Sequence, residues 1–492
     1  MSGARPLHEL TIVEAGARLR SGETTAVGLT EAILDRAHRT EAQLHAYLTL
    51  DRDGALAAAT AADEALAAGN DKGPLHGIPI ALKDNMCTRG LETTAASQIL
   101  AGYVPPYDAT VVARLRAAGA VLVGKTNLDE FAMGSSTENS AYGPSFNPWD
   151  IARVPGGSSG GSAAAVSAGS ALGALGSDTG GSIRQPASLT GIVGLKPTYG
   201  TVSRYGLIAF ASSLDQIGPL SKTVTDAALI LAQVWGHDPL DATSYAGEYP
   251  DPTADLDSGV DGLKIGVVKE FAGEGYEPAV EAAMASMLDE LADTGAEIVE
   301  VSLPTVDIAL SAYYLVAPAE ASANLARFDG IRYGHRAEGA TTETLMAKTR
   351  AEGFGPEVTR RILLGTYALS AGYYDAFYGQ AQRVRAALRD EFATAYQDVD
   401  VLVSPTSPTV AFRAGEKVDD PLSMYLTDIC TNPLNLVGHP GISLPVALDD
   451  EGLPVGFQVM APALGERMMF RVAAEVERLA GFTARPSLEE VA

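Results

Sequence analysis

The sequence contains little lysine, cysteine and tryptophan. Nine of its 492 residues are lysine and two each are cysteine and tryptophan, whereas 61 are aspartate or glutamate. Two cysteines, Cys87 and Cys430, are too few for a disulfide framework or a cysteine-based zinc site. The formal net charge of −26 argues against a nucleic-acid-binding surface over most of the chain, because phosphate contacts need clustered lysine and arginine.

Long apolar runs are also missing. Residues 1–8 contain no apolar signal core, and the small-residue stretch 162–176 is too short and too rich in glycine and serine to span a bilayer. We therefore expect a protein that makes no membrane contact. The low cysteine content indicates a reducing compartment, so we expect a cytoplasmic location.

The shortage of lysine beside an excess of acid allows two interpretations. Concentrated salt screens the repulsion between carboxylates, so an acidic, lysine-poor surface suits a halophilic protein. The alternative is an ordinary acidic cytoplasmic protein from a GC-rich genome. Equal folding in dilute buffer and in molar KCl would exclude the first interpretation.

Apolar residues make up 46% of the chain, which is ample for a large core. Helical spacing dominates residues 1–70, with one helix expected over 54–68. Beyond them, short apolar runs alternate with helical patterns. Strands are expected at 78–83, 121–123, 265–268, 298–301, 401–403 and 456–459, and helices at 110–118, 280–293 and 466–479. This alternation predicts an α/β fold, in one large domain, with helices covering both faces of a sheet.

The centre of the chain carries two glycine- and serine-rich motifs, PGGSSGGS at 155–162 and DTGGSIR at 178–184. A flexible linker is one interpretation, but apolar segments border the glycines on both sides. A phosphate-binding loop is a second interpretation, but the sequence does not contain the Gly-x-x-x-x-Gly-Lys-Ser/Thr pattern of such a loop. The segment GGSSG also fits the Gly-x-Ser-x-Gly pattern of a nucleophile elbow, which needs a histidine and an acidic residue further along the chain. The candidate histidines are His237, His335 and His439, and none of them lies in a distinctive sequence context.

The two motifs closely resemble those of the amidase signature family. The resemblance implies a Ser–cis-Ser–Lys triad, in which Ser182 is the nucleophile, Ser158 the bridging serine and Lys83 the base. Lys83 lies in GIPIALKDN at 77–85, the expected strand-end context. The family fold implied is a single domain over 1–492 with a central mixed sheet. It comprises a helical N-terminal segment (1–70), a catalytic core (71–220) and a part that faces substrate and partners (221–492).

The chemistry of these residue types agrees with the resemblance. A serine hydroxyl needs a base, and a lysine can act as one only when its surroundings lower its pKa. The apolar strand before Lys83 supplies desolvation. We expect Ser182 to open a helix, with the backbone N–H groups of Thr179, Gly180 and Gly181 forming an oxyanion hole.

Longer motifs narrow the resemblance to the glutaminase subunits of tRNA-dependent amidotransferases. They are GKTNLDEFAMGSSTENS at 124–140, EASANLAR at 320–327, RRILLGT at 360–366, YYDA at 373–376 and MYLTD at 424–428. The resemblance implies that glutamine binds through Arg361, which pairs with the carboxylate, and Asp428, which pairs with the ammonium. Tyr313 adds a hydrogen bond, although Tyr314 adjoins it.

The same resemblance implies the partners. Ammonia released from glutamine passes to a tRNA-handling subunit. That subunit uses ATP and Mg²⁺ to convert Asp-tRNA(Asn), Glu-tRNA(Gln) or both into Asn-tRNA and Gln-tRNA. A small third subunit holds the other two together. This chain itself is expected to hold no cofactor and no metal, and to meet tRNA only through the complex. Two alternatives stay open: a stand-alone amidase for simple carboxamides, and a non-catalytic scaffold.

Overall fold

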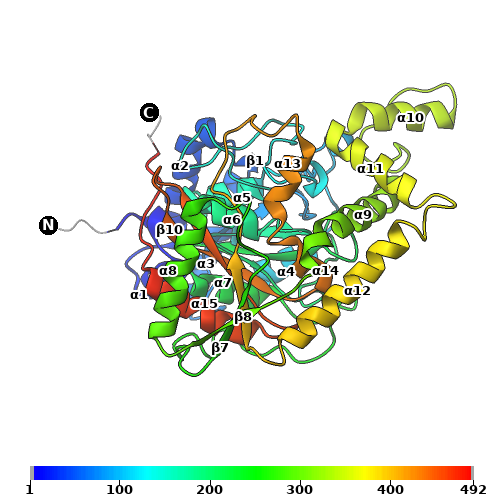
Figure 1. The fold of residues 1–492 in the computed structure, drawn as a ribbon. Coiled ribbons are helices and arrows are strands. Elements are labelled where there is room, and N and C mark those ends of the chain that lie inside the picture. Colours follow the sequence, from blue (N-terminus) through cyan, green and yellow to red (C-terminus); the bar gives the residue numbers. More distant parts are fainter. Residues whose placement is uncertain (1–4, 489–492) are drawn as a thin grey trace.

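A computed structural model describes residues 5–488 of the chain, and an eleven-stranded sheet forms its centre (Figure 1). The strand order across the sheet is β1-β3-β2-β4-β6-β5-β10-β11-β9-β7-β8. The strands are β1 (Tyr47–Leu50), β2 (Pro79–Lys83), β3 (Val121–Thr126), β4 (Gly173–Asp178), β5 (Val193–Lys196), β6 (Gln216–Ser221), β7 (Lys264–Val268), β8 (Glu297–Val301), β9 (Val401–Pro405), β10 (Gly441–Leu448) and β11 (Pro454–Met460).

The sheet is mixed. Strand β2 pairs in parallel with β3 and β4, and β7 pairs in parallel with β8 and β9, whereas the strands between these groups are antiparallel. All six predicted strands are present. The α/β fold with a central mixed sheet is therefore confirmed.

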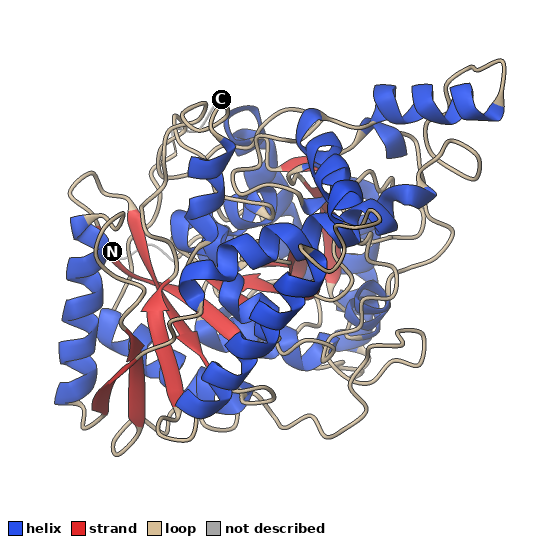
Figure 2. Cartoon of the chain, turned by 45° about the vertical axis from the view of Figure 1, so that its right-hand side comes forward, coloured by secondary structure: helices blue, strands red, loops and turns tan. Residues whose placement is uncertain are grey.

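Helices flank the sheet on both faces and gather at one end of it (Figure 2). They are α1 (Ile12–Ser21), α2 (Ala26–Leu44), α3 (Arg52–Ala67), α4 (Thr110–Ala117), α5 (Gly160–Ser167), α6 (Arg184–Thr190), α7 (Val224–Val234), α8 (Pro278–Asp293), α9 (Val306–Asn324), α10 (Thr342–Gly353), α11 (Pro356–Ala368), α12 (Tyr378–Ala395), α13 (Pro421–Tyr425), α14 (Asn432–Val437) and α15 (Glu466–Ala480). Within residues 5–488, none is both long and apolar enough to cross a bilayer.

The N-terminal segment is helical, as expected, and local sequence signals set its boundaries. Helix α1 starts with a capping box between Thr11 and Glu14 and ends at Gly22, which has a left-handed conformation. Between α2 and α3 the segment also contributes β1, which pairs antiparallel with β3 at the sheet edge. Residues 1–4 and 489–492 of the predicted domain lie outside the described residues.

A second apolar core supports the helices at one end of the sheet, where α9, α11 and α12 pack together. Gly365 of α11 lies against α9 so closely that a Cβ atom there would stand 1.9 Å from the carbonyl oxygen of Pro318. Only glycine permits this approach of two backbones. The contact fixes α11 against α9, and both helices carry residues of the site described next.

Candidate active site

Lys83 ends β2 with its side chain entirely buried. Its Nζ atom lies 2.8 Å from Ser158 Oγ, 2.9 Å from Ser159 Oγ and 3.2 Å from the carbonyl oxygen of Ser177. Burial lowers the pKa of the Lys83 ammonium to about 7, although nearby carboxylates act in the opposite direction. An amine of this kind can act as a base near neutral pH.

Ser158 lies in the turn that leads into α5, and the peptide bond between Gly157 and Ser158 is cis, as the resemblance implies. The turn is held by its neighbours, because the Gly157 N–H donates to Gln185 Oε1 at 3.0 Å. A Cβ atom on Gly157 would stand 2.2 Å from Asp129 Oδ2 and 2.5 Å from the backbone nitrogen of Ser136. Glycine is therefore required next to Ser158.

Ser182 lies between β4 and α6 and is 7% exposed. Its carbonyl oxygen accepts a hydrogen bond from the Ser159 N–H at 3.1 Å, which ties its loop to the turn of Ser158. Among residues 5–488, no side chain or backbone group bonds its hydroxyl, so that group is not held away from a substrate. The expected helix begins two residues later, at Arg184, because Ile183 is its N-cap residue.

One of the three predicted oxyanion-hole donors is already engaged. The N–H of Gly181 donates to Asp178 Oδ1 at 2.8 Å. It is therefore not free to bind an oxyanion in this structure. The assignment of the N–H groups of Thr179 and Gly180 stays a prediction.

A buried ion pair that the sequence reasoning missed supports the Ser182 loop. Arg184 Nε donates to Asp178 Oδ2 at 3.0 Å and Arg184 Nη2 donates to Oδ1 at 3.1 Å. Burial opposes ionisation of Asp178, but Arg184, Lys196 and Asn435 together lower the pKa of the carboxyl to about 2. Asn435 Nδ2 adds a hydrogen bond at 2.8 Å. Both charged residues lie in the motif DTGGSIR, six positions apart, and this proximity was the signal that could have predicted the ion pair.

Arg361 lies on α11 with its side chain buried, so it is not a solvated helix charge. Its Nε donates to Glu357 Oε1 at 2.7 Å, and the same oxygen accepts from the Tyr425 hydroxyl at 2.8 Å. The guanidinium lies near the rings of Tyr314 and Tyr425, which stack with 3.9 Å between centroids. Its two terminal nitrogens bond no acceptor among residues 5–488, so they can receive a carboxylate.

Asp428 lies at the end of the 3-10 helix Leu426–Asp428. One carboxylate oxygen accepts a short hydrogen bond from the Ser135 hydroxyl, whereas the other is buried without a partner in the described chain. Burial raises the pKa of Asp428 to about 7, while Ser135 and the charge of Arg361 lower it. A bound cation would satisfy this unpaired oxygen.

Tyr313 lies on α9 beside the Ser182 loop. A Cβ atom on Gly180 would stand 2.7 Å from the Tyr313 hydroxyl oxygen and 2.5 Å from Asn432 Oδ1. Tyr314, its neighbour in sequence, instead stacks on Tyr425 beside Arg361. Of this pair, Tyr313 is therefore the residue next to the predicted nucleophile loop.

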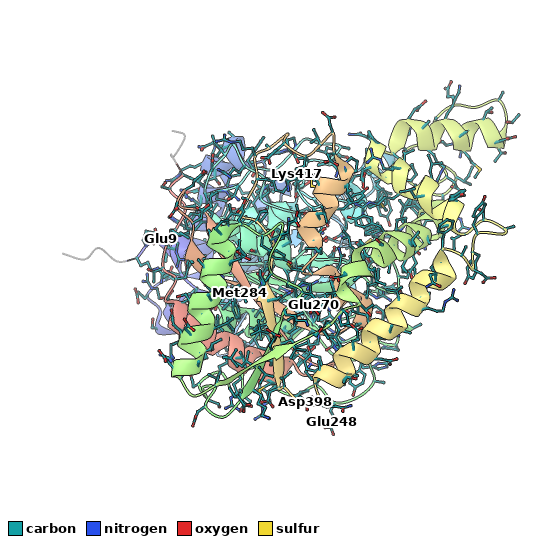
Figure 3. All side chains as sticks on the ribbon, viewed as in Figure 1. Glu9, Glu248, Glu270, Met284, Asp398 and Lys417 are labelled. Carbon is teal, nitrogen blue, oxygen red and sulfur yellow. The ribbon has the colours of Figure 1, made fainter. Side chains whose placement is uncertain are left out.

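A pocket opens beside Arg361 between α11, α13 and the loop at 134–139. Its lining includes Glu138, Arg360 and Lys417, and Lys417 is labelled in Figure 3. Sequence reasoning missed Glu357 and Tyr425, which line this pocket, and Ser135, which bonds Asp428. Tyr425 and Ser135 lie within quoted motifs, which was the available signal, whereas Glu357 lies three residues before RRILLGT.

Two of the three histidines considered for a nucleophile elbow have other contacts, and the third, His237, is exposed. His335 pairs with Glu352 at 2.9 Å, and the ring of His439 packs edge-on against Phe392. Among residues 5–488, no group of three or more histidine, cysteine or acidic side chains is placed to hold a metal ion. That the chain itself needs no cofactor stays a prediction.

Comparisons with known proteins agree on one family. The sequence profile of the Amidase family matches residues 28–470. The chain is 58% identical over 483 residues to a Glutamyl-tRNA(Gln) amidotransferase subunit of Chloroflexus aurantiacus, covering 98% of this chain and 99% of the relative. It is 56% identical over 474 residues to the protein of the same name from Streptomyces coelicolor, with 95% of each covered.

Solved structures show the same fold. The crystal structure of the corresponding Glutamyl-tRNA(Gln) amidotransferase subunit from Thermotoga maritima superposes with a TM-score of 0.81 at 42% identity, covering 98% of each chain. The native peptide amidase from Stenotrophomonas maltophilia superposes with a TM-score of 0.82 at 32% identity, covering 98% of this chain and 99% of that one.

Proposed function

Because the chain belongs to the amidase family, we propose that it is the glutamine-hydrolysing subunit of a tRNA-dependent amidotransferase. This proposal is carried by near-full-length relatives at 56% to 58% identity, whose names make each of them one subunit of a Glutamyl-tRNA(Gln) amidotransferase. They favour glutamyl-tRNA(Gln) as the final acceptor of the ammonia. The geometry around Lys83, Ser158 and Ser182 supports an amide-cleaving reaction.

The first proposed step is acylation of Ser182. Its Oγ attacks the side-chain amide carbon of glutamine, and its proton moves through the Ser158 hydroxyl to Lys83 Nζ. The C–N bond then breaks, and the same proton returns to the leaving nitrogen. Ammonia departs and a glutamyl ester remains on Ser182. Water hydrolyses this ester, which yields glutamate and restores the serine.

The contacts of Lys83 suit a neutral amine. Such an amine has two N–H donors and one lone pair. Two of its three polar contacts, Ser159 Oγ and the Ser177 carbonyl oxygen, can accept those hydrogens. The lone pair is then directed to the Ser158 hydroxyl at 2.8 Å. Burial of Lys83, which favours the neutral form, prepares it for this role.

The opposite charges of Arg361 and Asp428, which interact with each other, support glutamine as the substrate over a plain carboxamide. The free terminal nitrogens of Arg361 suit the α-carboxylate, and the unpartnered oxygen of Asp428 suits the α-ammonium. A plain amide carries neither charge. In the proposed enzyme the released ammonia passes to the tRNA-handling subunit, which uses ATP and Mg²⁺, and the acidic charge of this chain agrees with tRNA being bound there.

Ammonia release tests the proposal. Wild type and Ser182→Ala would be assayed in molar KCl with glutamine and with a panel of plain carboxamides, alone and co-expressed with the two other subunits. Glutamine turnover that vanishes in Ser182→Ala and grows with the partners is expected. Preference for plain amides with no gain from partners would instead identify a stand-alone amidase. Failure of a fluorophosphonate to label Ser182, together with no turnover, would favour the scaffold alternative.

A further inference from the structure

Gln185 follows Arg184 on α6, and its side chain is fully buried. Its Oε1 atom accepts a hydrogen bond from the Gly157 N–H at 3.0 Å, and its Nε2 atom donates one to the carbonyl oxygen of Ser135 at 3.0 Å. These partners fix the orientation of the amide, because the N–H must meet its oxygen and the carbonyl must meet its nitrogen. One side chain therefore joins two segments that are distant in the sequence.

The first of these segments is the turn that carries the bridging serine. Gly157 directly precedes Ser158, whose hydroxyl lies 2.8 Å from Lys83 Nζ. Helix α5, which follows the turn, and helix α6, which carries Gln185, lie side by side (Figure 1). The fit is close, because a Cβ atom on Gly156 would stand 2.4 Å from Gln185 Oε1. The bond from Gly157 therefore fixes the turn against the helix that follows the nucleophile loop.

The second segment is the wall around Asp428. The Ser135 hydroxyl donates a short hydrogen bond to one carboxylate oxygen of Asp428, the residue proposed to bind the α-ammonium of glutamine. The backbone carbonyl of the same serine is the group that Gln185 holds. A shift of the Ser135 backbone would move its hydroxyl as well and weaken the bond to Asp428.

We propose that Gln185 is a positioning residue for the hydrolysis of glutamine. Through Gly157 it places the bridging serine, and through Ser135 it places the carboxylate that selects an ammonium-bearing substrate. This inference rests on the proposed function, because it assigns both segments their roles in glutamine turnover. It gives Gln185 two effects that kinetics can separate.

The bond to Gly157 acts on kcat. Proton transfer needs Ser158 at a fixed distance from Lys83, and a small displacement of a reacting group lowers the rate. The bond to Ser135 acts on KM for glutamine alone, because a plain carboxamide has no ammonium to place against Asp428.

Gln185→Met keeps the length of the side chain and removes both hydrogen bonds. We expect kcat for glutamine to fall and KM to rise, each by about tenfold, whereas KM for a plain carboxamide stays as in wild type. The rate at which a fluorophosphonate labels Ser182 should fall by the same factor as kcat, because this probe carries no ammonium. The loss should be partial, since the Thr137 hydroxyl also holds the turn, through the Gly156 carbonyl oxygen at 2.8 Å.

Gln216→Met is the matched control. Gln216 is also fully buried, and its amide also bridges two backbone groups, the N–H of Gly200 at 2.9 Å and the carbonyl oxygen of Val202 at 3.1 Å. Loss of these bonds should lower the melting temperature and leave kcat and KM unchanged. If Gln185 were only structural, the two variants would behave alike.

A double-mutant cycle tests the link through Ser135. Ser135→Ala removes the hydroxyl that bonds Asp428, so it should raise KM for glutamine by itself. In Gln185→Met/Ser135→Ala the combined rise in KM should be smaller than the product of the single effects, because both changes weaken the same contact. A combined rise equal to that product would overturn this link.

A second variant covers a Gln185→Met chain that does not fold. Gln185→Asn keeps the amide but is one methylene shorter, so it cannot reach both partners, and the same kinetic pattern is expected. Wild-type kcat, KM and labelling rate in a folded variant, or failure of both variants to fold, would overturn the proposal. If wild type releases no ammonia from glutamine, alone or with the other subunits, the proposed function fails instead. Fluorophosphonate labelling would still show whether Gln185 positions Ser158.

Discussion

Glu357 and Arg361 stand one turn apart on α11, and a 2.7 Å hydrogen bond from Arg361 Nε to Glu357 Oε1 sets the direction of the guanidinium. Nε is used for this bond, which leaves the terminal nitrogens for a substrate carboxylate. Glu357 is therefore a positioning residue in the proposed reaction. Its removal should weaken glutamine binding without touching the acyl-transfer chemistry.

Glu357→Ala should raise KM for glutamine about ten- to a hundredfold and change kcat only a few-fold, because a charge-assisted hydrogen bond is lost from binding alone. The KM of Glu357→Gln should lie between those of wild type and Glu357→Ala, because the amide oxygen of the glutamine can still accept a hydrogen bond from Arg361. Steady-state kinetics on both variants measure the split. A fall in kcat with KM unchanged would contradict the positioning role.

Lys83→Met should reduce kcat by about 10²- to 10⁴-fold, the usual contribution of a general base. In wild type, kcat should rise as pH increases through about 7, because Lys83 accepts a proton only when neutral and its pKa is lowered to about 7 by burial. Ammonia release at saturating glutamine between pH 5.5 and 8.5 measures this. A kcat that is flat across this range would remove Lys83 as the titrating base.

Asp428 should control KM rather than kcat. Its pKa is raised to about 7 by burial, so the carboxylate that binds an ammonium is present mainly above that pH. KM for glutamine should therefore fall as pH rises from 6 to 8. Asp428→Asn should show a high KM at every pH, roughly a hundredfold above wild type at pH 8. An Asn variant that keeps the wild-type pH dependence would show that another group is responsible.

Gly157→Ala should destroy the site by sterics alone. Its new methyl group would stand 2.2 Å from Asp129 Oδ2 and 2.5 Å from the Ser136 nitrogen, so the turn that carries Ser158 must move. We expect the free energy of unfolding to fall by about 1–3 kcal/mol, which a lower melting temperature would show. We also expect glutamine turnover to be lost. Gly379→Ala is the control, because its nearest neighbour stands 3.6 Å away. Equal effects of the two variants would refute the steric argument.

Molar KCl should stabilise the protein. Lys83, Lys125 and Lys196 are fully buried, so three of the nine lysines leave the acidic surface without a counter-charge. Screening of the carboxylates should raise the melting temperature by about 5 °C or more between dilute buffer and 2 M KCl. Equal melting temperatures would favour the ordinary acidic protein of the alternative interpretation.

Periodicity predicted the fold best where the sequence is apolar and regular. Strands such as β7 and β9 are rich in valine, leucine or isoleucine, and their boundaries differ from the expected ones by only a few residues. Strand β4, GALGSD, was not predicted, because glycine and serine hide its pattern and burial on both faces decides its conformation. Strand β1 is only four residues long and depends on pairing with β3.

The residues of the candidate site were likewise predicted only in part. The resemblance supplied Lys83, Ser158, Arg361 and Asp428 as candidates, and the structure adds that all four are buried and that Lys83 contacts Ser158. It could not supply Glu357 or Ser135, because their roles depend on contacts between α11, α13 and the loop at 134–139. Nor could it show that the Gly181 N–H is engaged by Asp178.

The contact between Gly365 and Pro318 has a consequence for the rigidity of the site. It joins the helix of Arg361 to the helix of Tyr313, so the residue proposed to bind the carboxylate and the residue beside the nucleophile loop are held by one backbone contact. Any larger residue at position 365 would push the two helices apart and alter both sides of the proposed substrate site together.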